Sequence, residues 1–238
     1  MAKERLDKLI ASTGRWSRRE VKTLVREGRV LVDGRIAGSA EEKYDAESCR
    51  IAVNGEELLL RRHTYVMLHK PAGVLSATED GRGRTVLDLL TPELRKIGVF
   101  PVGRLDKDTE GLLLLTDDGE LAHALLSPKK HVDKVYYARV SGRLTPEDCA
   151  AFEAGMTLGD GLECLPAGLD ILAAGETSEC LVTLREGKFH QVKRMLAARG
   201  KPVTYLKRLS MGSLRLDDTL APGEFRLLTA AEEAQLQR

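Results

Sequence analysis

The stretch that decides the fold of this chain is GRLDKDTEGLLLLTDDG, residues 103–119. Four charged side chains lie within residues 104–108, and an unbroken apolar run follows from Leu112 to Leu115. A short run of branched apolar residues bounded by turn signals predicts a buried strand. We therefore expect the charged loop (Arg104, Asp106, Lys107 and Asp108) to be anchored against a core. A carboxylate held in this way can serve as a nucleophile, a base or a metal ligand.

The charge of the chain is distributed unevenly. Its 238 residues are 42% hydrophobic, which is enough for one or two domains, and the net charge is only +1. Residues 1–40 nevertheless hold ten Lys and Arg against five Asp and Glu, whereas residues 41–60 hold two against six. This asymmetry predicts a basic, phosphate-binding face near the start of the chain. From charge alone, a solvated helix face is an equally good interpretation.

The remaining composition indicates a cytoplasmic protein without a metal or cofactor. Four isolated cysteines form no CxxC pair, and the five histidines lack zinc-ligand spacing. No Gly-rich loop has the GxxxxGK form of a phosphate cradle. We expect no signal peptide, and no apolar stretch approaches the roughly 20 residues that span a bilayer.

Residues 1–60 are predicted to form a small domain with two helices and a hairpin. Leu6, Leu9 and Ile10 have helical spacing, and Ser17 with Glu20 forms a capping-box signature that begins a second helix. Asp33-Gly34 is a strong turn signal within Arg29–Ala37. Residues Glu56–His63 read as a linker.

Residues 64–238 mix strands and helices without strict alternation, which favours an α+β domain with a mixed, largely antiparallel sheet flanked by helices. Periodicity and end signals predict strands over Tyr65–Leu75, Lys134–Val140 and Cys180–Gly187, and helices over Glu120–Leu126, Thr145–Met156, His190–Gly200 and from Thr229 onward.

Three segments together resemble one family. Residues 103–119, KVYYA (134–138) and LREGKFHQVKRML (184–196) resemble the three active-site motifs of the bacterial ribosomal RNA pseudouridine synthases, and HKPAGVLSAT (69–78) resembles their opening strand. The basic N-terminal segment, with RLDKLI and SRREVKTLVREGRVLVDG, resembles the S4-like RNA-binding domain that precedes many of them. The segment APGEFRLLTAAEE (221–233) resembles the small-subunit, 16S-type branch.

This resemblance implies an isomerase that breaks the C1′–N1 bond of a uridine in ribosomal RNA and rejoins the uracil through C5. Such a reaction needs no redox change and no group donor. Asp106 matches the catalytic aspartate, whether it attacks C1′, attacks C6 or assists a glycal route. Lys193 matches the basic residue that pairs with it and keeps it ionised, although Arg194 could substitute.

The resemblance also assigns the residues around the uracil. Tyr136 matches the tyrosine that stacks on the base, with Tyr137 expected half in the core, because consecutive strand residues face opposite sides. Arg104 matches the arginine that fills the gap left by the flipped base, but it could instead pair with Asp108. Leu105, with Met195 or Leu196, is expected to supply apolar packing.

The N-terminal domain is expected to dock the RNA through a basic face. Its predicted RNA-binding residues lie on or beside the two predicted helices, and they are Arg5, Lys8, Arg18, Arg19, Lys22 and Arg26. The expected partner is ribosomal RNA, with 16S RNA preferred and either free or within an assembling subunit, and the protein is expected to be a monomer.

Three alternatives remain open at this stage. The RNA could be 23S rather than 16S. The chain could be a non-catalytic, ribosome-associated RNA-binding protein, since fold does not guarantee chemistry. DKDTEGLLLLTD (106–117) also places oxygen ligands at some positions of a calcium-binding EF-hand loop, although its position nine is Leu and its position twelve is Asp.

Overall fold

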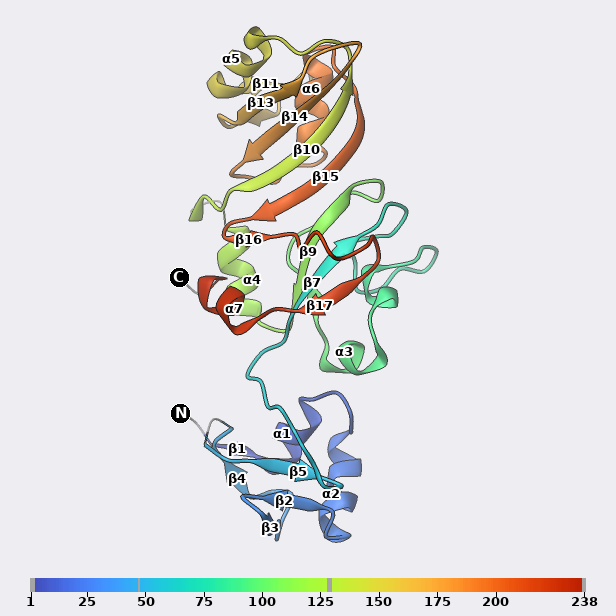
Figure 1. Cartoon of the computed structure of the whole chain (residues 1–238), viewed down its shortest axis with the longest axis vertical. Helices are drawn as coiled ribbons and strands as arrows, with labels where there is room; N and C mark the ends of the chain where they lie inside the picture. Colours follow the sequence, from blue (N-terminus) through green and yellow to red (C-terminus); the bar gives the residue numbers. More distant parts are fainter. Residues whose placement is uncertain (1–2, 47, 128–129, 237–238) are drawn as a thin grey trace. The chain divides into compact units, whose positions relative to one another are not determined.

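The computed structural model describes residues 3–46, 48–127 and 130–236, and it divides into two compact units. The first unit comprises Met1–Thr64 with Leu90–Val99, and the second comprises Tyr65–Leu89 with Phe100–Arg238. Both are drawn in Figure 1, and each is described by itself.

The first unit packs two helices against short strands. Its helices are α1 (Leu6–Ala11) and α2 (Arg18–Arg26), and the predicted capping box of Ser17 and Glu20 begins α2. A four-stranded sheet has the order β3-β2-β5-β6, with a separate β1–β4 pair. The strands are β1 (Glu4–Arg5), β2 (Val30–Val32), β3 (Arg35–Ile36), β4 (Lys43–Tyr44), β5 (Ile51–Val53) and β6 (Glu56–Glu57). The predicted helical stripe of Leu6, Leu9 and Ile10 is buried in this core.

Two tight hairpins shape this small sheet. Asp33 and Gly34 both have positive φ, 49° and 77°, as a two-residue turn between β2 and β3 requires. Asn54 and Gly55, at 56° and 80°, repeat this turn between β5 and β6. The prediction that Glu56–His63 is a linker is therefore wrong at its start, because Glu56 and Glu57 form a strand. The short α3 (Pro92–Ile97), which was not predicted, also belongs to this unit.

In the second unit, the described residues form one nine-stranded sheet with the order β13-β14-β10-β15-β9-β7-β17, extended by β16 on β15 and β8 on β9 (Figure 1). Only the β15–β9 pairing between these strands is parallel, so the predicted largely antiparallel sheet is confirmed. The strands are β7 (Tyr65–Lys70), β8 (Phe100–Pro101), β9 (Glu110–Thr116), β10 (Lys134–Ser141), β13 (Gly168–Ala173), β14 (Thr177–Leu184), β15 (Val203–Met211), β16 (Leu214–Arg215) and β17 (Phe225–Leu227).

Several strand ends differ from their predictions. β7 ends at Lys70 rather than Leu75, because Pro71 has no N–H to donate to the ladder. β14 begins at Thr177 and ends at Leu184, which leaves Arg185–Gly187 as a loop before the next helix. The apolar run of residues 112–115 lies fully buried in β9, as predicted.

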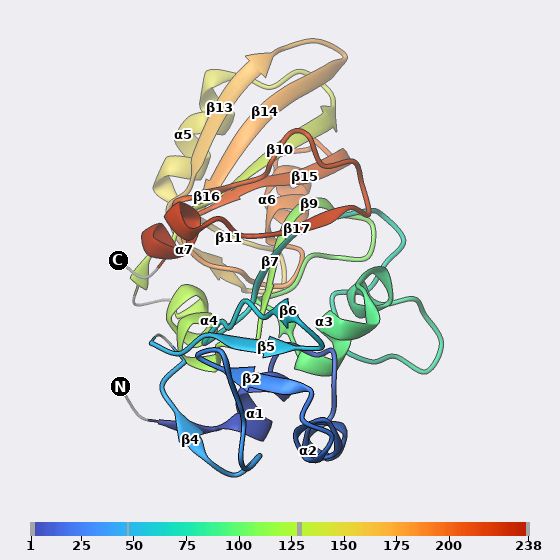
Figure 2. The same ribbon diagram turned by 60° about the horizontal axis from the view of Figure 1, so that its bottom comes forward.

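The helices cover the sheet at different places. Helix α5 packs on β13, α6 contacts β15 and α7 contacts β16, and Figure 2 shows α5 running along β13. The helices are α4 (Gly119–Leu126), α5 (Pro146–Ala154), α6 (Gln191–Ala198) and α7 (Ala230–Leu236), with a 3-10 turn at Val86–Leu89 and the pair β11 (Met156–Thr157) and β12 (Glu163–Cys164). No helix in the described part of the chain is both long and apolar enough to cross a bilayer.

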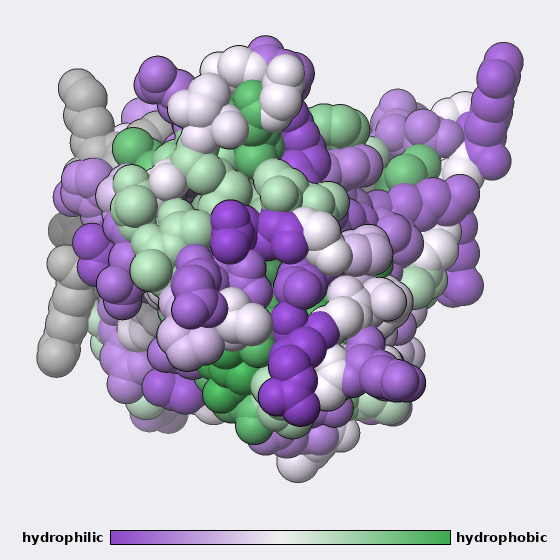
Figure 3. Space-filling view, turned by 90° about the horizontal axis from the view of Figure 1, so that it is seen from above, coloured by the Kyte–Doolittle hydropathy of each residue, from purple (hydrophilic) through white to green (hydrophobic). Residues whose placement is uncertain are grey.

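The end of the second unit that carries α5, β13 and β14 has a mixed surface. In Figure 3, hydrophilic side chains interrupt the apolar areas of this end. The large apolar core lies elsewhere, where Leu112 and Leu114 of β9 pack with Ala122 and Leu125 of α4.

Gly111 permits the single parallel pairing of the sheet. Its φ is +105°, and a Cβ at this position would lie 2.2 Å from the carbonyl oxygen of Arg208 in β15. Any side chain would therefore force β9 away from β15. The glycine that follows Glu110 in the 103–119 stretch is explained by this close approach of two backbones.

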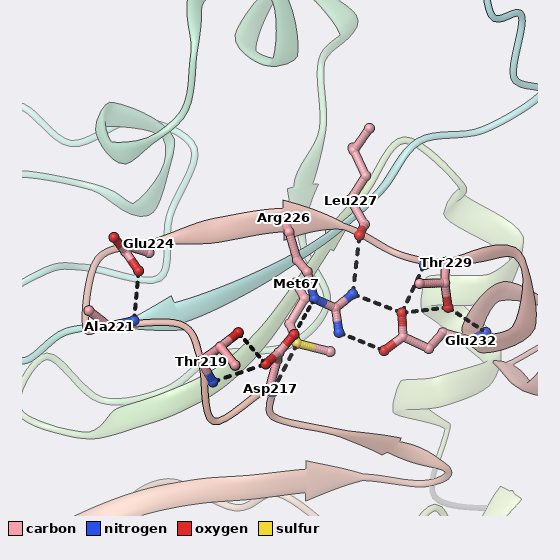
Figure 4. Close-up of polar contacts among 9 residues, drawn as sticks. All are labelled: Met67, Asp217, Thr219, Ala221, Glu224, Arg226, Leu227, Thr229 and Glu232. Carbon is pink, nitrogen blue, oxygen red and sulfur yellow. Dashed lines mark hydrogen bonds and ion pairs between the residues drawn. The ribbon is translucent and has the colours of Figure 1, made fainter.

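A charged cluster holds α7 to the sheet (Figure 4). The Arg226 guanidinium, on β17, donates two hydrogen bonds of 2.8 Å to Glu232 of α7 and one of 2.6 Å to Asp217. The bond from Arg226 to Glu232 and the bonds from Thr219 to Asp217 lower the pKa of each carboxyl to about 2. Thr229 and Glu232 also form the predicted cap of α7.

We predict that Arg226→Met lowers the free energy of unfolding at pH 7 by about 1–2 kcal/mol, through loss of the bidentate pair with Glu232. Because both carboxyl pKa values are depressed on folding, the stabilisation is complete above pH 4.5 and is lost as the pH falls toward 2. Melting temperatures of both proteins between pH 7 and 2.5 should therefore converge at the acid end. If the two melting temperatures differed by the same amount at every pH, the Arg226–Glu232 pair would not be the source of the lost stability.

Candidate active site

Asp106 lies in the loop between β8 and β9, and its carboxylate meets two groups from the start of α6. Asp106 Oδ2 is 2.9 Å from Lys193 Nζ, and Asp106 Oδ1 is 3.4 Å from His190 Nε2. The two partners of the predicted Asp106–Lys193 pair are thus brought together. Both side chains are about three-quarters buried, with 25% and 21% of their surface exposed. Partial burial strengthens their attraction relative to that of a surface pair.

Lys193 also binds a second carboxylate, since its Nζ donates to Asp108 Oδ1 at 2.6 Å. Burial alone would lower the pKa of Lys193, but hydrogen bonds to Asp108 and Asp106 outweigh it and raise this pKa. The bond from Lys193 in turn lowers the pKa of Asp108. One ammonium group therefore serves two carboxylates and stays charged at physiological pH.

A cleft joins Asp106 to Tyr136. Its lining residues come from the 103–109 loop, from β10, β14 and β15, and from the loop that leads into α6: Arg104, Leu105, Asp106, Thr109, Tyr136, Leu184, Gly187, Lys188, His190, Val192 and Leu206. Tyr136 therefore shares this cleft with Asp106, and Tyr137 lies on the opposite face of β10, 6.0 Å from the ring of Tyr205. Tyr137 is half-buried, and Tyr136, which borders the cleft, is only 8% exposed.

Of the other residues proposed from sequence, Arg104 and Leu105 line the cleft and Arg194 does not. Arg104 is exposed on the cleft, and among the described residues it has no hydrogen bond or ion pair, so the alternative pairing with Asp108 is not found. Leu105 is 5% exposed and lines the cleft. Arg194 does not substitute for Lys193, because it pairs with Asp160 at 2.5 Å.

The predicted apolar contribution of Met195 or Leu196 to the cleft is wrong. Both side chains are fully buried, but they face the core of the unit rather than the cleft. Their neighbour Val192, one helical turn away from Met195, provides the lining instead, together with Leu184 and Leu206. Spacing along α6 identified an apolar face correctly but could not show which end of it borders the cleft.

Sequence reasoning missed two residues that hold the Asp106 loop. Lys70, at the end of β7, is completely buried, and its ammonium donates to the carbonyl oxygens of Pro71, Lys107 and Thr109 at 2.8–3.2 Å. Burial lowers the pKa of Lys70 to about 8, although the nearby carboxylates oppose this shift. The Ser76 hydroxyl donates to the Leu105 carbonyl at 2.8 Å and accepts from its N–H at 3.0 Å. The segment HKPAGVLSAT contains both residues.

The geometry excludes the calcium-loop alternative. Residues Glu110–Thr116 form strand β9 in the interior of the sheet, so they cannot fold as the second half of a twelve-residue EF-hand loop. Asp106 and Asp108 meanwhile share the ammonium of Lys193. The arrangement presents a carboxylate anchored beside a cation, at the wall of a cleft that also contains an aromatic ring.

The predicted RNA-binding residues of the first unit are largely engaged in ion pairs with neighbouring acids. Arg5 and Arg18 both contact the buried carboxylate of Asp7 at 2.9 Å, and Glu41 binds Arg5 and Lys22 at 2.9 and 3.1 Å. Lys8 pairs with Glu4 at 2.6 Å. Within the described chain, only Arg19 and Arg26 of the predicted set have no acidic partner. These two and Lys22 line a surface pocket with Glu41.

Comparison with known proteins identifies the class of both units. The sequence model described as RNA pseudouridylate synthase matches residues 64–198, and that of the S4 domain matches residues 4–48. The chain belongs to the RNA pseudouridylate synthase family and carries an N-terminal S4 domain. Both assignments agree with the resemblance drawn from the sequence motifs.

The relatives cover nearly the whole chain. A Bacillus subtilis protein named "Uncharacterized RNA pseudouridine synthase YtzG" is 50% identical, with 96% of each chain covered. A Vibrio cholerae protein named "Ribosomal small subunit pseudouridine synthase A" is 40% identical, covering 98% of this chain and 99% of its own. A solved structure described as "Crystal structure of pseudouridylate synthase" is 35% identical with a TM-score of 0.68, covering 98% of this chain and 99% of that one.

We predict that turnover falls as the pH rises through about 8, because Lys70 then loses a proton and one of its hydrogen bonds to the loop carbonyls. Lys70→Met should lower kcat by about 10- to 100-fold while RNA affinity changes little, since loop geometry is lost and the RNA-facing surface is kept. Single-turnover rates between pH 6.5 and 9.5 measure both effects. If the Lys70→Met variant kept the fall in turnover near pH 8, a group other than Lys70 would be its cause.

We predict that Glu41→Gln raises the affinity of the protein for RNA about 3- to 10-fold at low salt, because it frees Lys22 for a phosphate while Arg5 stays paired with Asp7. The log–log slope of affinity against salt should steepen by about one unit. Glu57→Gln, an exposed change on β6, is the matched control. Equal affinities for the two variants would show that Glu41 does not restrain this face.

Proposed function

We propose that this protein converts a uridine of ribosomal RNA to pseudouridine, with Asp106 as the catalytic residue. The observation that carries the proposal is the Asp106 carboxylate, held 2.9 Å from Lys193 Nζ at a cleft that Tyr136 also lines. The reaction needs an ionised carboxylate beside the sugar and the base. The ammonium of Lys193 attracts the negative charge of this carboxylate at 2.9 Å.

The other cleft residues suit the remaining requirements of this reaction. Tyr136 presents an aromatic ring on which the uracil can stack, and Leu105 adds an apolar contact. A uridine in folded RNA must be flipped out at a cost of a few kcal/mol. Arg104 is exposed beside the cleft, and its planar cation can occupy the vacated stack or bind a phosphate.

We assign RNA docking to residues 1–60 and catalysis to residues 64–238, in a monomer that acts in the cytoplasm. The S4 domain model matches residues 4–48 of this chain, and the pocket beside α2 offers phosphate contacts through Arg19 and Arg26. In this arrangement one domain binds the RNA and the other modifies it. RNA affinity and the rate of catalysis can therefore be measured independently.

The small-subunit RNA is the preferred substrate in this proposal. Its support is the end segment 221–233, which resembles the 16S-type branch, and the small-subunit name of the Vibrio cholerae relative. A Bacillus subtilis relative, 39% identical over 98% of this chain, is named "Ribosomal large subunit pseudouridine synthase B". Large-subunit RNA is therefore the second candidate.

We predict that Asp106→Asn abolishes the release of tritium from C5-labelled uridine in a 16S transcript and leaves RNA affinity within about 2-fold, because the amide cannot act as the ionised carboxylate. Asp218→Asn, an exposed change in the same unit, is the control and should retain full activity. Turnover by the Asp106 variant would overturn the assignment of Asp106.

The identity of the RNA is tested separately. Ribosomal RNA from a deletion strain, complemented with the wild-type protein or the Asp106→Asn variant, is mapped by carbodiimide-blocked primer extension across both subunits. A stop that the wild-type protein restores in 16S RNA supports the preferred substrate, and a stop in 23S RNA supports the second candidate.

A further inference from the structure

Phe189 stands apart from every other aromatic side chain in the described part of the chain. It is 74% exposed, whereas the remaining Phe, Tyr and Trp residues are buried or half-buried. Phe189 lies in the loop between β14 and α6, immediately before His190. An exposed ring gains nothing from the hydrophobic core. Its two neighbours in the sequence, Lys188 and His190, line the cleft, so a ligand that enters the cleft can cover this ring.

The ring of Phe189 is stacked on the imidazole of its neighbour. The two ring centroids are 3.8 Å apart and the planes differ by 18°. Consecutive side chains diverge in a regular helix or strand, so a parallel pair requires irregular backbone. His190 provides it, with a left-handed conformation of φ 51° and ψ 31° at the N-cap of α6. This conformation is unfavourable for a side-chain-bearing residue and recurs at functional sites.

The stacked pair is tied to the catalytic carboxylate. His190 Nε2 lies 3.4 Å from Asp106 Oδ1, and His190 lines the same cleft as Asp106 and Tyr136. The inner face of the Phe189 ring is covered by His190, and its outer face remains open. A planar group stacked on that face would lie one ring beyond His190, next to the mouth of the cleft.

Two cations lie on the Asp106 loop. Arg104 lines the cleft, and Lys107 is exposed in the same loop. Neither side chain has an ion pair with an acid among the residues that the structure describes. A phosphate-linked chain of bases that passes the cleft therefore meets positive charge on the Asp106 loop and an aromatic face on the α6 loop. Single-stranded nucleic acid is bound by this combination of a basic track and stacking platforms.

We propose that the Phe189–His190 pair is a stacking platform for an unpaired base of the RNA that neighbours the target uridine. The inference rests on the proposed function, and it adds a recognition element outside the pocket that holds the uracil. It requires the RNA to be single-stranded or opened on one side of the target. It also gives His190 a positioning role, because the imidazole fixes the distance between the platform and Asp106.

The test compares Phe189→Ala and Phe189→Leu with Phe189→Trp, using full-length protein and a 16S transcript labelled with tritium at C5 of uridine. Loss of one base–aromatic stack should raise KM about 5- to 100-fold for the Ala and Leu variants while kcat falls less than 3-fold. Phe189→Trp should stay within 3-fold of wild type. Leu172→Ala removes another exposed apolar side chain, on β13, and is the control.

A second readout locates the contact. A transcript that contains 4-thiouridine is photo-crosslinked to the wild-type protein, and the tryptic peptide of residues 189–193 should carry the label. The label should be lost in Phe189→Ala and kept in Phe189→Trp. Binding is measured in the Asp106→Asn background, so that affinity is reported without turnover.

The outcomes separate this inference from the proposed function. Normal KM and undiminished cross-linking in the Ala and Leu variants would overturn the platform. A defect with ribosomal particles but none with naked RNA would assign Phe189 to a protein partner, and a fall in kcat alone would assign it to the geometry of the Asp106 loop. Either result refutes the proposal. Absence of tritium release by the wild-type protein from both 16S and 23S transcripts would instead refute the proposed function.

Discussion

The ion pair between Asp106 and Lys193 is the constraint on which the site depends. It joins a loop that precedes β9 to the first turn of α6, two segments far apart in the sequence. The two can meet because β15, which follows α6, pairs in parallel with β9. Gly111 makes that pairing possible by letting the two backbones approach. The position of the Asp106 carboxylate is therefore determined by the packing of the sheet, and substitutions at Gly111 act on the site without touching it.

The charges around this pair are unequal, because one ammonium group contacts two carboxylates. Lys193 is shared by Asp106 and Asp108, and it lies closer to Asp108. Asp106 therefore shares its cation with a second carboxylate. Lys70 contributes a second positive charge from beneath the loop, but its hydrogen bonds go to three carbonyl oxygens rather than to a carboxylate. A buried cation held in this way fixes the backbone and leaves the carboxylate free for substrate.

The sequence predicted those features that local chemistry determines. Capping signals located α2 and α7, Asp33-Gly34 located a hairpin, and the 112–115 run located a central strand. The second hairpin carried the same signal at Asn54-Gly55 and was overlooked. The pairing of Asp106 with Lys193 came from the resemblance to a family, because no local pattern relates two charged residues so distant in sequence.

The features that could not be predicted depend on tertiary context. Lys70 reads as a strand-end lysine beside a proline, and only the fold shows that it is buried under the Asp106 loop. Val192 rather than Met195 borders the cleft because of the rotation of α6 on the sheet. The basic face of the first unit was identified by composition, but its neutralisation by Asp7 and Glu41 requires chain segments to come together in three dimensions.

The distribution of partners separates residues that stabilise this protein from residues that remain available to a ligand. Arg5, Arg18 and Lys22 are engaged with acids, and removing any of them would disturb the first unit as well as its charge. Arg19, Arg26 and Arg104 lack acidic partners in the described chain, and Phe189 has an open ring face. These groups can contact RNA without first breaking an ion pair. Affinity should therefore depend more on the unpaired cations than on the total positive charge, which explains how a chain of net charge +1 can bind a polyanion.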